Sequence, residues 1–156
     1  MITINNNMYV LDTDNTSYVF AVLGSGQLEH LYYGRKLHAN EAVMREKHTF
    51  IPGNTNVYNK DYSSYSLEDV CLEMSSLGKG DIREPFIEVT YPNGSSTTDM
   101  VFDRAEIIQG KEEYDMLPGS YDDNGEVEQL VIYLKDRNYN LTLELHYYVY
   151  EKCDII

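Results

Sequence analysis

Alternation of apolar and polar side chains is clearest near the end of the chain. In the run LTLELHYYV, residues 141–149, leucine takes the first three odd positions, and Tyr147 and Val149 continue the same face. The side chains between them are mostly polar, so the period is two, which predicts a long half-buried strand. Residues 130–134 alternate in the same way. The turn-forming residues 135–140 between the two runs predict an antiparallel hairpin.

A second hairpin is predicted near the beginning. Residues 16–23, TSYVFAVL, form a continuous run of β-branched and aromatic side chains, and residues 27–33 form a second apolar run. Gly24-Ser25-Gly26 between them is a tight-turn sequence. We therefore expect two paired strands here.

Further strands are predicted in the middle of the chain. The runs 65–74 and 86–91 are rich in strand-forming residues, although the apolar spacing in 65–74 also fits a helical face. Pro92-Asn93-Gly94 predicts a turn that leads into another strand within 97–108. Many short strands without a long helical period predict one all-β domain over residues 1–156, an antiparallel sandwich with few or no helices.

One segment departs from this pattern. Residues 38–64 carry weak periodicity and many polar and turn-forming residues. An excursion of that length within a compact domain is usually functional or disordered. A second irregular stretch, residues 116–128, is acidic and rich in turn formers.

Composition narrows the classes of partner. The 156 residues are 42% apolar, which suits one globular domain, and the formal net charge is −14. This charge repels phosphate groups, so we expect neither nucleic acid nor an anionic membrane as a partner. The N-terminus has no basic stretch followed by an apolar one, which predicts a cytoplasmic protein without a signal peptide. Cys71 and Cys153 lie in strand-like runs and are expected to be buried free thiols.

The stretch GKGDIREP, residues 78–85, allows three interpretations. A phosphate-binding loop needs a Ser or Thr after the lysine and a following helix, and both are missing. Two carboxylates three residues apart suit glycosidase chemistry, but such pairs are frequent in a chain with 26 acidic residues. We favour a structural corner that leads into a strand, formed by Gly78, Gly80, Asp81, Arg83, Glu84 and Pro85.

The remaining reactive side chains form no recognised constellation. The four histidines have none of the spacings of a metal site, and no Gly-x-Ser-x-Gly sequence occurs. We therefore expect no metal, no cofactor and no catalytic residue in this chain.

Four stretches, in this order, resemble a known family. They are the runs SYVFAVLGSGQLEHLYYGRKL, YSLEDVCLEMSSLGKGDIREPFIEV, IIQGKEEYDMLPGSY and LTLELHYYVYEKCDII. Together they are similar to the N-terminal region of the α-galactosidases of glycoside hydrolase family 36, over roughly residues 17–156. The resemblance implies a twisted β-supersandwich of the galactose-mutarotase-like kind. It also implies that a (β/α)8 barrel with two catalytic aspartates follows this region.

The family's activity is expected to lie in that barrel. Members of the family are retaining enzymes that release terminal α-galactose from sugars such as melibiose and raffinose. Their nucleophile lies in a Lys-Trp-Asp motif, and this chain has no tryptophan. A chain of 156 residues is also too short for a barrel of about 250 residues. We therefore expect no activity from this chain, which would support its own barrel and take part in homo-oligomers.

The resemblance also points to a sugar contact. In tetrameric relatives a long loop of this domain helps to close the sugar site of a neighbouring subunit. The matching part of this chain is the excursion 38–64, so contact with a galacto-oligosaccharide would be weak or indirect. Its candidate residues are Arg45, Glu46, Lys47, His48 and Phe50.

Two alternative functions remain open from the sequence. A freestanding carbohydrate-binding module would need aromatic platforms, for which exposed tyrosines such as Tyr148 or Tyr150 are the candidates. A structural interaction domain would make no sugar contact.

Overall fold

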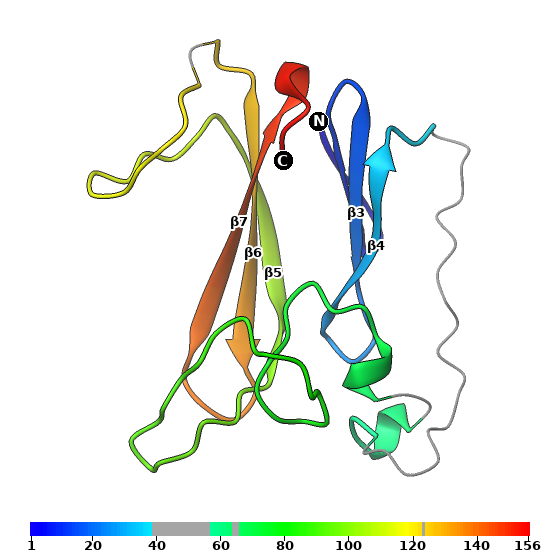
Figure 1. Cartoon of the computed structure of the whole chain (residues 1–156), viewed down its shortest axis with the longest axis vertical. Helices are drawn as coiled ribbons and strands as arrows, with labels where there is room; N and C mark the ends of the chain where they lie inside the picture. The colour runs from blue at the N-terminus through cyan, green and yellow to red at the C-terminus, as the bar shows by residue number, and fades with distance from the viewer. Residues whose placement is uncertain (39–56, 64–65, 123) are drawn as a thin grey trace.

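The computed structural model describes residues 1–38, 57–63, 66–122 and 124–156, and these form two antiparallel sheets that face each other (Figure 1). The strands of the first sheet, in spatial order, are β1 (Ile2–Asn5), β2 (Met8–Asp12), β3 (Thr16–Val22) and β4 (Leu28–Arg35). Those of the second are β5 (Met100–Gln109), β6 (Val127–Asp136) and β7 (Thr142–Tyr150). The predicted all-β sandwich is confirmed.

The helical content of the described residues is limited to three single turns of 3-10 helix. They are η1 (Lys60–Tyr62), η2 (Leu67–Asp69) and η3 (Glu151–Cys153). No helix in the described ranges has the length and apolar character needed to cross a membrane.

The core lies between the two sheets. Leu11 and Phe20 of the first sheet pack in one cluster with the even-numbered β6 residues Leu130, Ile132 and Leu134. All five are at most 2% exposed. Burial of side chains of this size stabilises the fold by roughly 1.5–3 kcal/mol each. The apolar residues that alternate in the sequence therefore supply most of the stabilising contact between the sheets.

Two strands were missed at the N-terminus. β1 and β2 form a hairpin across Asn6, whose φ of 57° is left-handed. Asparagine tolerates this conformation better than most residues, so the Asn-rich sequence of residues 5–7 was the available signal.

Two predicted strands were wrong. Residues 65–74 contain η2 instead, and the structure assigns no strand to 86–91. In this second segment the Phe86 amide donates to the Ser75 carbonyl at 2.9 Å, but no neighbouring strand offers a continuous ladder. Alternating side chains alone do not make a strand when the backbone has no partner. The turn predicted after it is present, because the Gly94 amide donates to the Tyr91 carbonyl at 2.8 Å.

The two cysteines are exposed rather than buried. Cys71 follows η2, between the buried Val70 and the partly buried Leu72, and its own side chain faces outward. Cys153 lies on the exposed side of η3. Both predictions of burial assumed a strand at these positions, and neither residue lies in one.

The segments between strands gather at opposite ends of the sandwich. Residues 66–99 cross one end, while residues 110–122 project from the other end, near both chain termini (Figure 1). This arrangement separates the predicted corner from the second irregular stretch.

Candidate functional site

The predicted corner is held by one arginine. The Arg83 guanidinium lies 2.8 Å from Asp81 Oδ1 and donates to the carbonyls of Val70 and Leu67 at 2.7 and 2.6 Å. Gly78 and Gly80 have φ values of +94° and +86°, which explains the choice of glycine. This geometry ties the corner to η2.

Other residues of the stretch 78–85 take no part in this ion pair. Glu84 is exposed, and no strand follows Pro85. Lys79 turns toward the protein, with Nζ 3.4 Å from Asp99 Oδ2. A lysine that is paired with a buried carboxylate is not presented to a phosphate, which argues against a phosphate-binding loop.

The five predicted sugar-contacting residues, Arg45, Glu46, Lys47, His48 and Phe50, lie outside the described residues. The residues that flank this part of the excursion are anchored. The Leu37 amide donates to Ser17 Oγ at 2.9 Å, and the hydroxyl of buried Tyr58 donates to Asp99 Oδ1 at 2.9 Å.

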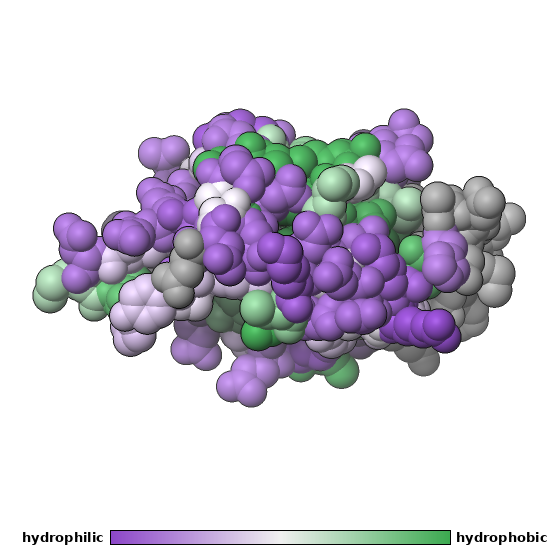
Figure 2. Space-filling view, turned by 90° about the horizontal axis from the view of Figure 1, so that it is seen from above, coloured by the Kyte–Doolittle hydropathy of each residue, from purple (hydrophilic) through white to green (hydrophobic). Residues whose placement is uncertain are grey.

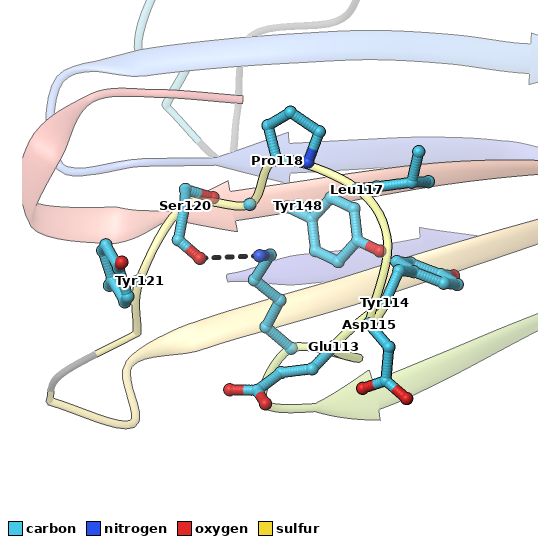
Figure 3. Close-up of a pocket in the computed structure, with 10 residues that line it drawn as sticks. Glu113, Tyr114, Asp115, Leu117, Pro118, Ser120, Tyr121 and Tyr148 are labelled. Carbon is cyan, nitrogen blue, oxygen red and sulfur yellow. Dashed lines mark hydrogen bonds between the residues drawn. The ribbon is translucent and has the colours of Figure 1, made fainter.

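A hollow of about 420 Å³ occurs within the loop that follows β5. Lys111 closes this loop by donating from Nζ to the Ser120 carbonyl at 2.6 Å. Figure 3 shows the ring of Tyr148, from β7, inside the curve of the loop. The loop also supplies Glu113 and Asp115 to the lining. Tyr148 was one of the two tyrosines singled out from the sequence, and the other, Tyr150, hydrogen-bonds through its hydroxyl to Ser120.

Polar contacts fasten the loop to the outer face of the second sheet. The Tyr114 hydroxyl donates to Glu112 Oε2 at 3.0 Å and lies 3.4 Å from His146 Nδ1. Fully buried Gln129 donates to the same nitrogen at 2.7 Å. Burial, the Tyr148 hydroxyl and the Glu112 carboxylate raise the pKa of Tyr114, so its hydroxyl stays protonated as a donor.

Three apolar side chains of the loop are exposed, and two of them, Leu117 and Tyr121, also line the hollow. Met116 is 92% exposed, Leu117 68% and Tyr121 85%. Ile155, near the C-terminus at the same end of the sandwich, is also exposed. We call Met116, Leu117 and Tyr121 the apolar end face. Seen from this end, the surface is mostly hydrophilic with separate hydrophobic patches, one of them on the projecting loop (Figure 2).

The sequence marked this loop only as irregular, acidic and rich in turn formers. The Leu-Pro-Gly-Ser-Tyr sequence at 117–121 was the available signal for an exposed turn. Across the ranges that the structure describes, no group of three His, Cys, Asp or Glu side chains is placed to hold a metal ion.

These features define a two-sheet antiparallel sandwich with a projecting, apolar-tipped loop beside its C-terminus. Residues 26–156 match the model of the glycosyl hydrolase family 36 N-terminal domain. The chain therefore belongs to this family, and the resemblance seen in the sequence is confirmed.

Curated relatives agree with the family match. The chain is 33% identical over 153 residues to the bifunctional α-galactosidase/sucrose kinase AgaSK of Mediterraneibacter gnavus, covering 97% of this chain and 16% of that protein. It is 33% identical over 152 residues to the α-galactosidase AgaA of Geobacillus stearothermophilus, covering 94% and 20%. The chain thus spans about a fifth of the length of these relatives or less.

Solved structures are similar in three dimensions. The α-galactosidase from Lactobacillus brevis superposes with a TM-score of 0.85 at 30% identity, over 96% of this chain and 20% of that one. A variant of AgaA crystallised with raffinose superposes with a TM-score of 0.79 at 30% identity, over 93% and 20%.

Proposed function

We propose that this chain is the non-catalytic N-terminal part of an α-galactosidase and that its apolar end face packs against the catalytic domain. The observation that carries the proposal is the exposure of Met116, Leu117 and Tyr121 on one loop, at the end of the sandwich where the C-terminus lies. Uncovered apolar side chains that cluster in this way mark protein contacts. The relatives are much longer than this chain, so the part of them that it does not cover would contain the catalytic domain that packs against it.

The reaction proposed for the parent enzyme is hydrolysis of terminal α-galactosyl residues with retention of configuration. Its substrates would be oligosaccharides such as raffinose, which is the sugar bound in the AgaA variant, and melibiose. A pair of carboxylates is needed for that chemistry, one as nucleophile and one as acid and base. Both are assigned to the catalytic domain, and none to this chain.

Two further roles extend the proposal. Residues 45–50 would contribute to the rim of a neighbouring subunit's sugar site, and the domain would support a homo-oligomer. The resemblance to the family is the support for both roles. A cytoplasmic location likewise stays a prediction.

A second candidate is direct carbohydrate binding at the hollow of about 420 Å³. Tyr148 and Tyr121 supply rings that suit the apolar face of a pyranose, and Glu113 and Asp115 supply acceptors for hydroxyl groups. Titration of the isolated chain with galactose, melibiose and raffinose by heteronuclear NMR separates the two candidates. Shifts confined to the loop would favour binding, and unchanged spectra would favour docking.

A chimera tests the docking proposal. The aligned N-terminal region of AgaA is replaced by this chain, and hydrolysis of p-nitrophenyl α-D-galactopyranoside is measured. We expect the chimera to be active, AgaA without the region to be inactive, and the isolated chain to be inactive. Leu117→Asp in the chimera should weaken domain docking by about tenfold or more, because a buried charge replaces an apolar anchor. Thermal unfolding followed by activity would report this loss.

The matched control is Ile82→Asp. Ile82 is 84% exposed and belongs to the segment at the other end of the sandwich. It should leave the activity and unfolding of the chimera unchanged. Equal effects of the two substitutions, or hydrolysis by the isolated chain, would contradict the proposal.

A further inference from the structure

A second concave site lies between the two sheets. This inter-sheet cleft has a volume of about 430 Å³ and is lined by Tyr18 of β3, Tyr147 of β7, Glu73, Glu144 and Phe86, among others. Phe86 comes from the segment that crosses the end of the sandwich opposite the termini (Figure 1). The cleft is therefore separate from the hollow beside Lys111.

Glu73 places a carboxylate deep in this cleft. Its side chain is only 5% exposed. Oε1 accepts hydrogen bonds from the Tyr18 hydroxyl and from the Tyr147 hydroxyl, the latter at 3.0 Å. Oε2 lies 3.3 Å from His30 Nδ1. A carboxylate has about four acceptor positions, and these three contacts leave one of them, on Oε2, unused.

The surrounding groups hold this carboxylate in place. Burial, followed by the proximity of Glu73, raises the pKa of both tyrosine hydroxyls, which therefore remain protonated donors. The two rings lie 6.2 Å apart between centroids, one from each sheet. The site is thus formed by residues of both sheets.

The formally charged side chains of the lining are the carboxylates of Glu73 and Glu144, and its described residues include no lysine or arginine. His146 also lines the cleft, with Nε2 3.1 Å from Glu144 Oε2. The rings of Tyr18, Tyr147 and Phe86 supply aromatic surface. Carboxylates with aromatic faces form a good environment for an organic cation, through charge-assisted hydrogen bonds and cation–π contact. An anionic ligand would be repelled.

We propose that the inter-sheet cleft receives an arginine or lysine side chain from a polypeptide partner. The cationic group would approach Glu73 Oε2, with Glu144 at the side. Phe86, which is 66% exposed, would cover the aliphatic stem of the incoming side chain. The acidic net charge of −14 favours approach of a basic surface. This inference goes beyond the proposed function and stands without it.

The test uses a matched pair of peptides. The chain is titrated with acetyl-Gly-Arg-Gly-amide and with the same peptide carrying citrulline, which keeps the shape of arginine and removes its charge. Backbone amide shifts are followed by heteronuclear NMR. We expect saturable shifts at Phe86, Leu145 and Tyr147 with the arginine peptide, and affinity at least about tenfold lower with citrulline.

Substitutions then show which carboxylates bind the arginine peptide. Glu73→Gln and Glu144→Gln should each weaken binding of the arginine peptide, whereas Glu106→Gln should not, because half-exposed Glu106 lies on β5 away from the cleft. If Glu73→Gln unfolds the chain, the affinity of Glu144→Gln for the arginine peptide and the affinity of the wild type for the citrulline peptide still test the proposal. Equal binding of both peptides, equal effects of all variants, or no shift at millimolar peptide would overturn the proposal.

Discussion

Gly78 shows how one position constrains the corner. Its φ is +94°, and a Cβ added there would lie 2.7 Å from Thr97 Cγ2. A side chain at this position therefore meets both backbone strain and a steric clash.

We expect Gly78→Ala to lower the free energy of unfolding by roughly 2–4 kcal/mol, measured by urea denaturation. Gly94→Ala is the matched control. Gly94 also has a positive φ, of +82°, but no atom lies within 4 Å of its added Cβ. Gly94→Ala should therefore lower the free energy of unfolding by only about 1–2 kcal/mol. Adding Thr97→Ser, which removes the clashing methyl group, should recover part of the loss in Gly78→Ala. Equal losses at the two glycines would show that the clash is unimportant.

At the scale of elements, Arg83 connects the corner to η2. Its guanidinium satisfies buried Asp81 and two backbone carbonyls at once. Removal of the arginine leaves the Asp81 carboxylate with a single backbone donor, the Arg83 amide itself at 3.1 Å.

We expect Arg83→Met to lower the free energy of unfolding by about 3 kcal/mol, because it leaves the buried Asp81 carboxylate without its charged partner. The free energy of unfolding of Arg83→Lys should lie between those of Arg83→Met and the wild type, since an ammonium group cannot reproduce the planar fork of the guanidinium. Exposed Glu84→Gln should change stability by less than about 0.5 kcal/mol. Urea denaturation of the three variants checks this order, and a large loss at Glu84 would contradict it.

At the scale of the whole molecule, Asp154 joins the C-terminus to the first sheet. Its carboxylate accepts from the Thr13 hydroxyl, the Asn15 backbone amide and the Asn15 side chain, each at 2.8 Å. The Asn15 side chain, the Thr13 hydroxyl and the Asn15 amide lower the pKa of Asp154, in that order. The carboxylate is therefore favoured in the folded state.

This shift predicts a pH-dependent contribution to stability. A lowered folded-state pKa gives stability that is fully present above the unfolded value of about 3.9, and it is lost as pH falls through the folded value. Asp154→Asn keeps the left-handed φ of 55° accessible and removes the charge. We expect a lower urea midpoint at pH 7, with the difference shrinking below about pH 4. Asp115→Asn, at an exposed position, should show no difference at either pH.

The strands were predictable where side-chain alternation and backbone pairing coincide. β3, β4, β6 and β7 were located from their patterns, and β5 from the turn before it and its apolar run. The run 86–91 alternates equally well and is not a strand, because no neighbouring strand pairs with it. β1 and β2 were missed because their runs are short and the turn between them carries only asparagines.

The candidate sites were less accessible to sequence reasoning. The Asp81–Arg83 pair is two residues apart and was found from local spacing. The Glu73 cluster joins His30, Tyr18 and Tyr147, which are 43, 55 and 74 residues away from it. No local pattern reports such a juxtaposition, because it depends on how two sheets are stacked.

From the residues alone, the all-β class, the β3–β4 and β6–β7 hairpins and the family could be predicted. These depend on local periodicity, on turn chemistry and on motifs whose order survives in one dimension. Three properties became evident only in the folded chain. They are the side chains that meet between the sheets, the apolar residues left uncovered at the end of the sandwich, and the outward orientation of both thiols. These properties follow from the pairing and stacking of distant segments, since burial and electrostatics depend on neighbours in space rather than along the chain.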